Sequence, residues 1–85
     1  MFDWDSANAD HIALHRVTIV EAEEALLDRH RIFEQAQLTD EARWAVIGAT
    51  EAGRVLFVVF TRRGPRIRVV TARDALSRER HRYRR

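Results

Sequence analysis

The fold is decided by residues 43–71, which read RWAVIGATEAGRVLFVVFTRRGPRIRVVT. Three short apolar runs at 43–49, 54–61 and 67–71 are separated by the turn sequences EAG and RGP. Runs of this length, bounded by glycine or proline, are typical of strands joined in hairpins. The sequence therefore predicts a three-stranded antiparallel meander, preceded by a weaker strand at 31–35.

The middle run of this meander is apolar at every position from 55 to 60. A strand with apolar side chains on both faces suits the centre of a sheet, because both faces must then be covered. We expect helices to cover one face and something else, such as a partner protein, to cover apolar area on the other.

A first helix is expected near the N-terminus. Asp5 or Ser6 can act as its N-cap, and the helical pattern ends near Arg16. The residues that share one side of this helix, at spacings of four, four and three, are Trp4, Asn8, Ile12 and His15.

Two further helices complete the expected fold. Thr18 and Glu21 form a capping-box pattern for a helix at about 19–28, whose inner stripe is Ala22, Ala25 and Leu26. An arginine-rich helix is expected at 75–83. The fold class is therefore α+β, with two N-terminal helices, a four-stranded and mainly antiparallel sheet and a C-terminal helix, and the 85 residues form one domain at 1–85.

Charge divides the chain into two parts. Residues 1–53 carry four arginines and eleven carboxylates, whereas residues 54–85 carry eleven arginines and two carboxylates. The two parts stand at −7 and +9, which the net charge of +2 conceals. A concentrated arginine field attracts polyanions and makes their binding salt-dependent, so nucleic acid is the first partner to test.

Composition also excludes several classes. The chain has no cysteine, which excludes disulfides, thiolate zinc sites and thiol catalysis. Its longest apolar run has six residues, at 55–60, far short of the roughly 20 that cross a bilayer. We expect a cytoplasmic protein without membrane contact.

On the fourth strand, side-chain alternation decides which arginines act together. Regular alternation places Arg66, Arg68 and Val70 on one face and Ile67, Val69 and Thr71 on the other. Exposed strand arginines commonly serve only to keep a sheet edge from aggregating. With the nearby residues Arg62, Arg63 and Arg73, however, they can surround one concave patch.

Several segments together resemble the BrnT toxins of bacterial type II toxin–antitoxin systems. RIRVVTAR at 66–73, followed by SRERHRY at 77–83, is similar to the C-terminal signature of that family. FDWD at 2–5 looks like its opening tetrapeptide, and HIALHRVT at 11–18 resembles the segment that ends its first helix. The order and spacing also agree at 43–60, so the resemblance covers essentially the whole chain.

The resemblance implies a RelE-like ribonuclease that cleaves RNA, inhibits translation and halts growth. It also implies a cognate antitoxin, typically of the ribbon-helix-helix type, which neutralises the toxin and through which the complex reaches operator DNA. Three residues depart from the family pattern: Leu14 replaces a basic residue, Arg16 replaces glycine and Leu76 replaces a capping threonine. Arg16 is expected to strain the turn or shift the helix end, because glycine supplies a left-handed C-cap there. These departures bear on catalytic competence more than on fold.

The chemistry expected of such a site is metal-independent RNA cleavage. It needs a base for the 2′-hydroxyl proton, donors for the phosphorane and an acid for the departing 5′-oxygen. We assign Arg68 and Arg73 to the phosphate and the family-matched His15 to general acid–base catalysis. The residues expected to bind flanking RNA are Arg62, Arg66, Arg78 and Tyr83, although Tyr83 is more typical of packing against the sheet.

Other chemistries are disfavoured. His11 and His15 are four residues apart, as metal ligands can be, but Ile12 stands where the zinc-hydrolase motif needs glutamate. No phosphate-cradling glycine loop and no serine elbow is present. We therefore expect no metal and no cofactor.

Two alternatives remain to the nuclease. Leu14 and Arg16 motivate a toxin-derived module that binds RNA or antitoxin but has lost catalysis. The arginine-rich end can also serve mainly to dock an acidic antitoxin segment, since charge complementarity does not distinguish carboxylates from phosphates.

Overall fold

The computed structural model describes residues 1–38 and 41–84. In chain order the elements are α1 (Ser6–Ala13), α2 (Ile19–Leu27), β1 (Ile32–Leu38), β2 (Ala42–Ala49), β3 (Val55–Arg63), β4 (Arg66–Asp74) and α3 (Ser77–Tyr83). The expected α+β fold, with two N-terminal helices, four strands and a C-terminal helix, is confirmed. The boundaries differ from the expected ones by a few residues: α1 ends at Ala13 instead of near Arg16, and α3 begins at Ser77 instead of at 75.

The N-terminal helices begin where the capping signals predict. Asp5 caps α1 by accepting hydrogen bonds from the backbone N–H groups of Ala7 and Asn8 at 2.9 and 3.2 Å. Thr18 accepts from the N–H of Glu21 at 3.1 Å, and the Glu21 carboxylate accepts from the N–H of Thr18 at 3.0 Å. These bonds satisfy donors that a helix start leaves without partners.

The turn after α1 keeps a left-handed residue without glycine. Arg16 has a φ of 60°, and its N–H donates to the carbonyl of Ala13 at 2.9 Å. The N–H of Val17 reaches back to the carbonyl of Ile12 at 3.2 Å, and both of these side chains are buried. This bonding is the Schellman arrangement, in which the left-handed position is usually glycine. Arg16 therefore adopts the strained left-handed conformation that was expected, and α1 ends before it, at Ala13.

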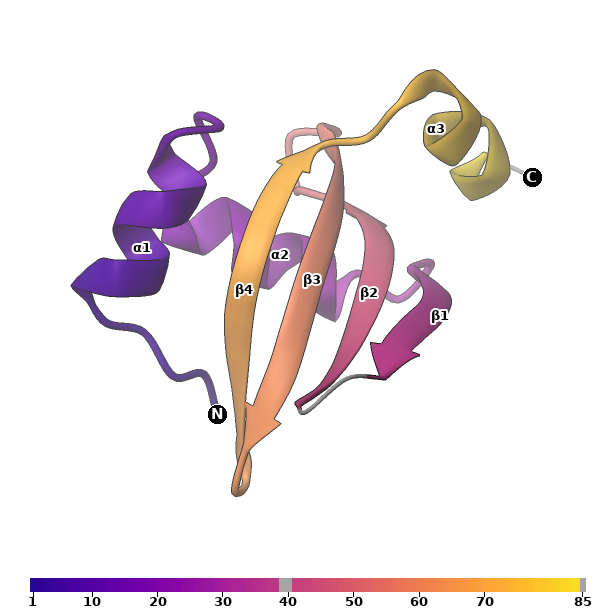
Figure 1. The fold of residues 1–85 in the computed structure, drawn as a ribbon. Helices are drawn as coiled ribbons and strands as arrows, with labels where there is room; N and C mark the ends of the chain where they lie inside the picture. Colours follow the sequence, from indigo (N-terminus) through magenta and orange to yellow (C-terminus); the bar gives the residue numbers. More distant parts are fainter. Residues whose placement is uncertain (39–40, 85) are drawn as a thin grey trace.

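The four strands form one antiparallel sheet in the order β1-β2-β3-β4. Figure 1 shows α1 beside β4, α2 crossing one face of the sheet and α3 at the end of the sheet beyond β1 and β2. The predicted hairpins are confirmed, with positive φ values at Gly53 and Gly64 in their turns. As expected, β3 lies between two neighbouring strands.

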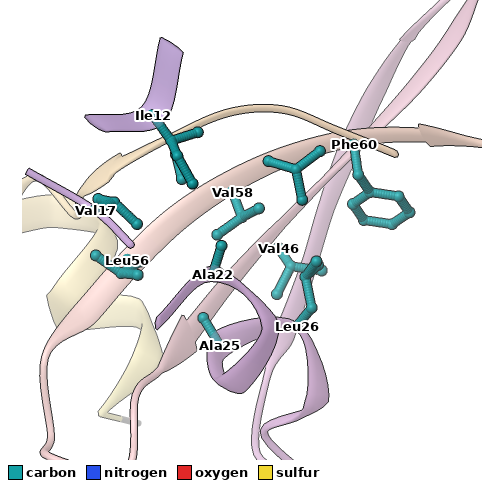
Figure 2. Packing of buried hydrophobic residues seen from close by; sticks show 11 residues of the cluster. Ile12, Val17, Ala22, Ala25, Leu26, Val46, Leu56, Val58 and Phe60 are labelled. Atoms are coloured by element: carbon teal, nitrogen blue, oxygen red, sulfur yellow. The ribbon is translucent and has the colours of Figure 1, made fainter. Parts of the chain in front are cut away.

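The core lies between α1, α2 and the sheet, as Figure 2 shows. The predicted inner stripe of α2 is buried throughout. The buried residues of the core cluster are Ile12, Val17, Ala22, Ala25, Leu26, Val46, Leu56, Val58, Phe60, Val69 and Ala72. Gly48 lets α2 approach β2 closely, because a Cβ at this position would lie 2.1 Å from the carbonyl oxygen of Ala25.

A bulge in β4 changes the face on which its last residues lie. Val59 pairs with Thr71, but the next β3 residue, Phe60, pairs with Val69, so Val70 is the extra residue. Regular alternation placed Thr71 with Val69, and that prediction is wrong. The extra residue reverses the alternation, so that Thr71 shares a face with Arg68 instead.

The edge of β4 is covered by the N-terminal segment. Phe2 forms a parallel bridge with Ile67, where the N–H of Asp3 donates to the Ile67 carbonyl and the N–H of Ile67 donates to the Met1 carbonyl, both at 2.8 Å. This segment therefore protects an edge that would otherwise present unpaired backbone groups. Within residues 1–38 and 41–84, no helix has the length and apolar character needed to span a membrane.

Candidate functional site

The bulge in β4 brings two predicted phosphate ligands onto one face of the sheet. Arg68 pairs with Thr61 and Arg73 pairs with Phe57 on β3. Positions 57 and 61 are four residues apart, so they share a face and are separated by about 13 Å along the strand. Arg68 and Arg73 are five residues apart in sequence, so a regular strand would have placed them on opposite faces.

A cleft of about 320 Å³ lies between α1 and this face of β4. Its charged and polar lining includes His11 from α1, Arg43 from β2, Arg63 from β3 and Arg68 from β4. Thr61 also lines it, but its hydroxyl donates to the Ala42 carbonyl at 2.7 Å. The cleft therefore combines three guanidinium groups and one imidazole with one carboxylate, Glu41, which lies 4.0 Å from Arg43 and 3.8 Å from Arg63.

Arg68 is held by the N-terminal carboxylates. Its guanidinium donates to Asp5 at 3.1 Å and lies 3.6 Å from Asp3, and its side chain is 14% exposed. The hydrogen bond with Arg68 is the main cause that lowers the pKa of Asp5. Asp5 is also the cap of α1, so this interaction ties the start of α1 to β4. Arg68 thus has a structural role, and RNA must compete with carboxylates for its guanidinium.

Arg73 forms a clamp with α3. Its guanidinium makes two hydrogen bonds to Glu79, at 2.8 and 3.1 Å, and lies 4.3 Å from the centre of the Phe57 ring. The hydrogen bonds from Arg73 lower the pKa of Glu79, whose side chain is only 8% exposed. Glu79 also accepts from the N–H of Leu76 at 2.8 Å. Glu79 thereby supplies a helix-start interaction at the position where Leu76 offers no side-chain acceptor.

His15 lies one helical turn beyond His11 and does not line the cleft. The two rings meet edge to face, with their centroids 5.9 Å apart. Arg54 supports the turn that carries His15, because it donates to the carbonyls of Arg16 and His15 at 2.7 and 3.4 Å. The same guanidinium pairs with Asp74 at 2.8 Å.

The remaining predicted RNA-binding residues are dispersed. Arg66 is exposed at the β3-β4 hairpin, where it pairs with Arg63 of the cleft, and Arg78 is exposed on α3. Arg62 pairs with Ile67 and belongs to the opposite face of the sheet. Of the seven predicted site residues, all of which the structure describes, the cleft lining includes Arg68 and not the other six.

Tyr83 lies near the end of α2 and the end of β2, where it lines a pocket with Leu27, Asp28 and Ala49. Its hydroxyl donates a short hydrogen bond to the Asp28 carboxylate, and its ring is half-buried. Burial, together with the hydrogen bond to Asp28, raises the pKa of Tyr83 to about 12. Its hydroxyl is therefore engaged within the protein.

The cleft contains residues that the sequence did not assign to RNA binding. His11 and Arg43 come from α1 and β2, and only the folded chain brings them beside Arg68. Arg63 was expected near Arg68 in one concave patch, and it lines the cleft. The sequence carried one signal for His11, which follows Asn8 by one helical turn. In the structure the Asn8 amide donates to the Val69 carbonyl at 3.1 Å. Asn8 therefore fixes the side of α1 that faces β4. In the part of the chain that the structure describes, no three side chains of the metal-ligating types cluster as an ion site requires.

Comparison with known proteins gives one family. The family model described as "Ribonuclease toxin, BrnT, of type II toxin-antitoxin system" matches residues 4–79. None of the curated proteins matches the chain. The matched span begins just before α1 and ends within α3, so it includes every residue of the cleft.

Proposed function

This chain belongs to the BrnT family of ribonuclease toxins of type II toxin–antitoxin systems, and on that premise we propose that it cleaves RNA without a metal in the cleft between α1 and β4. The observation that supports this proposal is the convergence of His11, Arg43, Arg63 and Arg68 on one hollow. Guanidinium groups are well suited to phosphate because they donate in pairs and stay charged.

In the proposed reaction, Arg68 donates to the scissile phosphate while Arg43 and Arg63 hold adjoining phosphate oxygens. The 2′-oxygen attacks phosphorus, its proton passes to an imidazole, and the bond from phosphorus to the 5′-oxygen breaks. A second acid protonates that 5′-oxygen, which leaves a 2′,3′-cyclic phosphate and a 5′-hydroxyl. His11 and His15 are the proposed acid–base pair, since their rings are in contact and imidazole is the side chain used most often for general acid–base catalysis.

Arg73 is proposed to hold RNA farther along the same face. Because Arg73 lies about 13 Å from Arg68 along β3, it is suited to contact a neighbouring part of the RNA rather than the same phosphate. Arg66 and Arg78 are exposed and add positive charge along the path, with Arg62 and Tyr83 as more distant candidates for RNA contact.

The first test is RNA cleavage by purified protein in the presence of a chelator of divalent metals. Arg68→Ala is expected to reduce the cleavage rate by about 100-fold or more, as the loss of a transition-state donor does. Arg29→Ala, which removes an exposed arginine outside the cleft, is the matched control. Asp5→Asn separates the structural role of Arg68 from the chemical one, because asparagine also caps helices but leaves Arg68 without that ion pair.

The assignments fail if Arg68→Ala cleaves RNA at the wild-type rate, or if Asp5→Asn removes activity as completely as Arg68→Ala does. His11→Ala and His15→Ala test the acid–base pair separately. Each is expected to lower the rate and to remove one limb of the pH–rate profile. A profile that is unchanged in both variants excludes the pair. Mass analysis of the products distinguishes the cyclic phosphate from other ends.

Neutralisation by a cognate antitoxin and inhibition of translation are the biological consequences we propose. Expression of the chain alone in the cytoplasm should stop the growth of the cells, and co-expression of its antitoxin should restore growth. A ribbon-helix-helix antitoxin would supply the contact with operator DNA. Growth that continues while the intact protein accumulates, and RNA that remains whole, would contradict this part.

A binding module without catalysis is the second candidate. It is favoured by the carboxylates that already hold Arg68 and Arg73, since these pairs reduce the number of donors available to a phosphorane. In that case the protein binds RNA with a steep salt dependence but produces no cleavage, even on translating ribosomes.

A further inference from the structure

An apolar groove lies on the opposite side of the sheet from the cleft. It has a volume of about 400 Å³ and its lining residues are Met1, Phe2, Leu26, Leu27, Arg31, Phe33, Val46, Phe60, Arg62 and Ile67. Its floor joins the core at Leu26, Val46 and Phe60, which Figure 2 shows lying close together. We call this surface the α2 groove.

Three large apolar side chains are left in contact with solvent around the α2 groove. Met1 is 74% exposed, Phe33 is 61% exposed and Leu27 is 59% exposed. They come from three separate segments, the N-terminus, β1 and the end of α2. Contiguous apolar surface of this kind marks an interaction site more often than isolated exposed residues do.

The charges of the α2 groove have one sign. Among the residues that the structure describes, the ionisable side chains that line it are Arg31 and Arg62, and no carboxylate does. Arg31 lies over the Phe33 ring, 5.2 Å from its centre, and also donates to the Asp28 carbonyl at 3.0 Å. Neither arginine is paired with a carboxylate among the interactions of the described residues. An occupant that complements this surface must therefore present apolar side chains flanked by acidic ones.

These properties argue against two other occupants. A second copy of the chain, placed by a two-fold axis, would bring the same two arginines, Arg31 and Arg62, to the other side of the interface and create like-charge repulsion. RNA would gain from the two arginines but would cover the aliphatic side chains of Met1 and Leu27 with a hydrated polyanion. An amphipathic helix places apolar anchors in such a groove at helical spacing and its charged residues along the rim.

We infer that the α2 groove docks an acidic amphipathic segment of a protein partner. The inference rests on the proposed function in one respect, because the partner there is the antitoxin. It goes beyond that function by placing the contact on the face opposite the RNA cleft. Ile67 and Arg68 are consecutive on β4 and point to opposite faces, so docking in the groove leaves the cleft open. Docking and inhibition are therefore separable.

The test uses the full-length protein and the co-purified antitoxin, with affinity measured by titration calorimetry. Leu27→Ser and Phe33→Ser are each expected to weaken the complex by about tenfold or more, as the loss of an apolar anchor does. Val20→Ser is the matched control, since Val20 is 61% exposed on α2 but lies outside the groove. Arg31→Glu should also weaken the complex, whereas Arg29→Glu should not.

RNA cleavage distinguishes this inference from the proposed nuclease. The groove variants should cleave RNA at the wild-type rate, and Arg68→Ala should bind antitoxin normally while failing to cleave. Unchanged antitoxin affinity in all three groove variants overturns the inference. So does a groove variant that loses RNA binding or self-association, measured by sedimentation, while it keeps the antitoxin.

A measurement on the wild-type protein removes any dependence on how the variants fold. The backbone amides of Leu27 and Phe33 should gain protection from hydrogen exchange when antitoxin is added. Their amide signals and the methyl signals of Leu27 should also shift in NMR spectra. Changes confined to α1 and β4 would place the antitoxin at the cleft and overturn the inference.

Discussion

Replacing Arg16 with glycine should stabilise this protein. Arg16 has a φ of 60°, in the left-handed region, and it occupies the position after α1 where the Schellman bonds form. The left-handed conformation costs a residue with a Cβ about 1–2 kcal/mol. Glycine also increases the conformational freedom of the unfolded chain, which lowers the free energy of unfolding by about 0.4–1 kcal/mol and offsets part of the gain. The expected net gain in the free energy of unfolding is about 0.5–1 kcal/mol.

Denaturant unfolding followed by circular dichroism measures this gain, and the melting temperature should rise by about 2–8 °C. Leu14→Gly is the matched control, because Leu14 lies two residues earlier, is 78% exposed and has a right-handed helical φ of −61°. There, glycine should cost about 0.5–1 kcal/mol. Arg16→Ala removes the same long side chain but keeps the Cβ. The reasoning is refuted if Arg16→Gly is no more stable than Arg16→Ala.

Three further changes test other contacts. Gly48→Ala should destabilise the protein by about 3 kcal/mol in urea unfolding, because the new Cβ meets the α2 backbone at 2.1 Å. Gly53→Ala meets no atom within 4 Å and should cost only the strain of its φ of 91°, about 1–2 kcal/mol, so equal losses would contradict the steric argument. Because the pKa of Glu79 is lowered in the folded protein, its carboxylate adds stability at pH values above its ordinary pKa of 4.5, and this stability is lost as pH falls through the folded pKa. Glu79→Gln should therefore flatten the acid limb of the plot of stability against pH, and an unaltered slope would contradict this prediction. Tyr83 is the one tyrosine of the chain, and its phenolate absorbance should appear near pH 12, with its contribution to stability lost as pH rises from about 10 through that value. A midpoint at the ordinary value of 10.0 would show that the hydrogen bond to Asp28 does not hold the phenol.

The secondary structure could be predicted because its signals are local. Thr18 and Glu21 lie within one helical turn of each other, so their capping box is visible in the sequence and is present in the structure. Gly53 and Gly64 supply positive φ values that hairpin turns favour, and the strands follow on either side of them. The α2 stripe could be predicted for the same reason, since helical periodicity alone selects the buried face.

The candidate site could not be predicted to the same extent, because its geometry depends on residues far apart in the chain. Regular alternation would separate Arg68 from Arg73, and only the pairing of β4 with β3 reveals the bulge at Val70. His11 reaches the cleft because α1 packs beside β4, a contact between segments about 60 residues apart. The sequence assigned Asp5 to the start of the first helix and Asp3 to an acidic front end, but it did not predict that either carboxylate contacts Arg68.

Sequence alone therefore determined the order of the elements, their approximate positions, the α+β class and the resemblance to the family, because each depends on neighbouring residues or on a linear pattern of residues. Tertiary structure alone decided which guanidinium groups share a face, which are already held by carboxylates and where apolar surface remains open. The physical reason is that charges and apolar side chains interact through space. One extra residue in a strand, such as Val70, is enough to exchange the faces on which all later side chains of that strand lie.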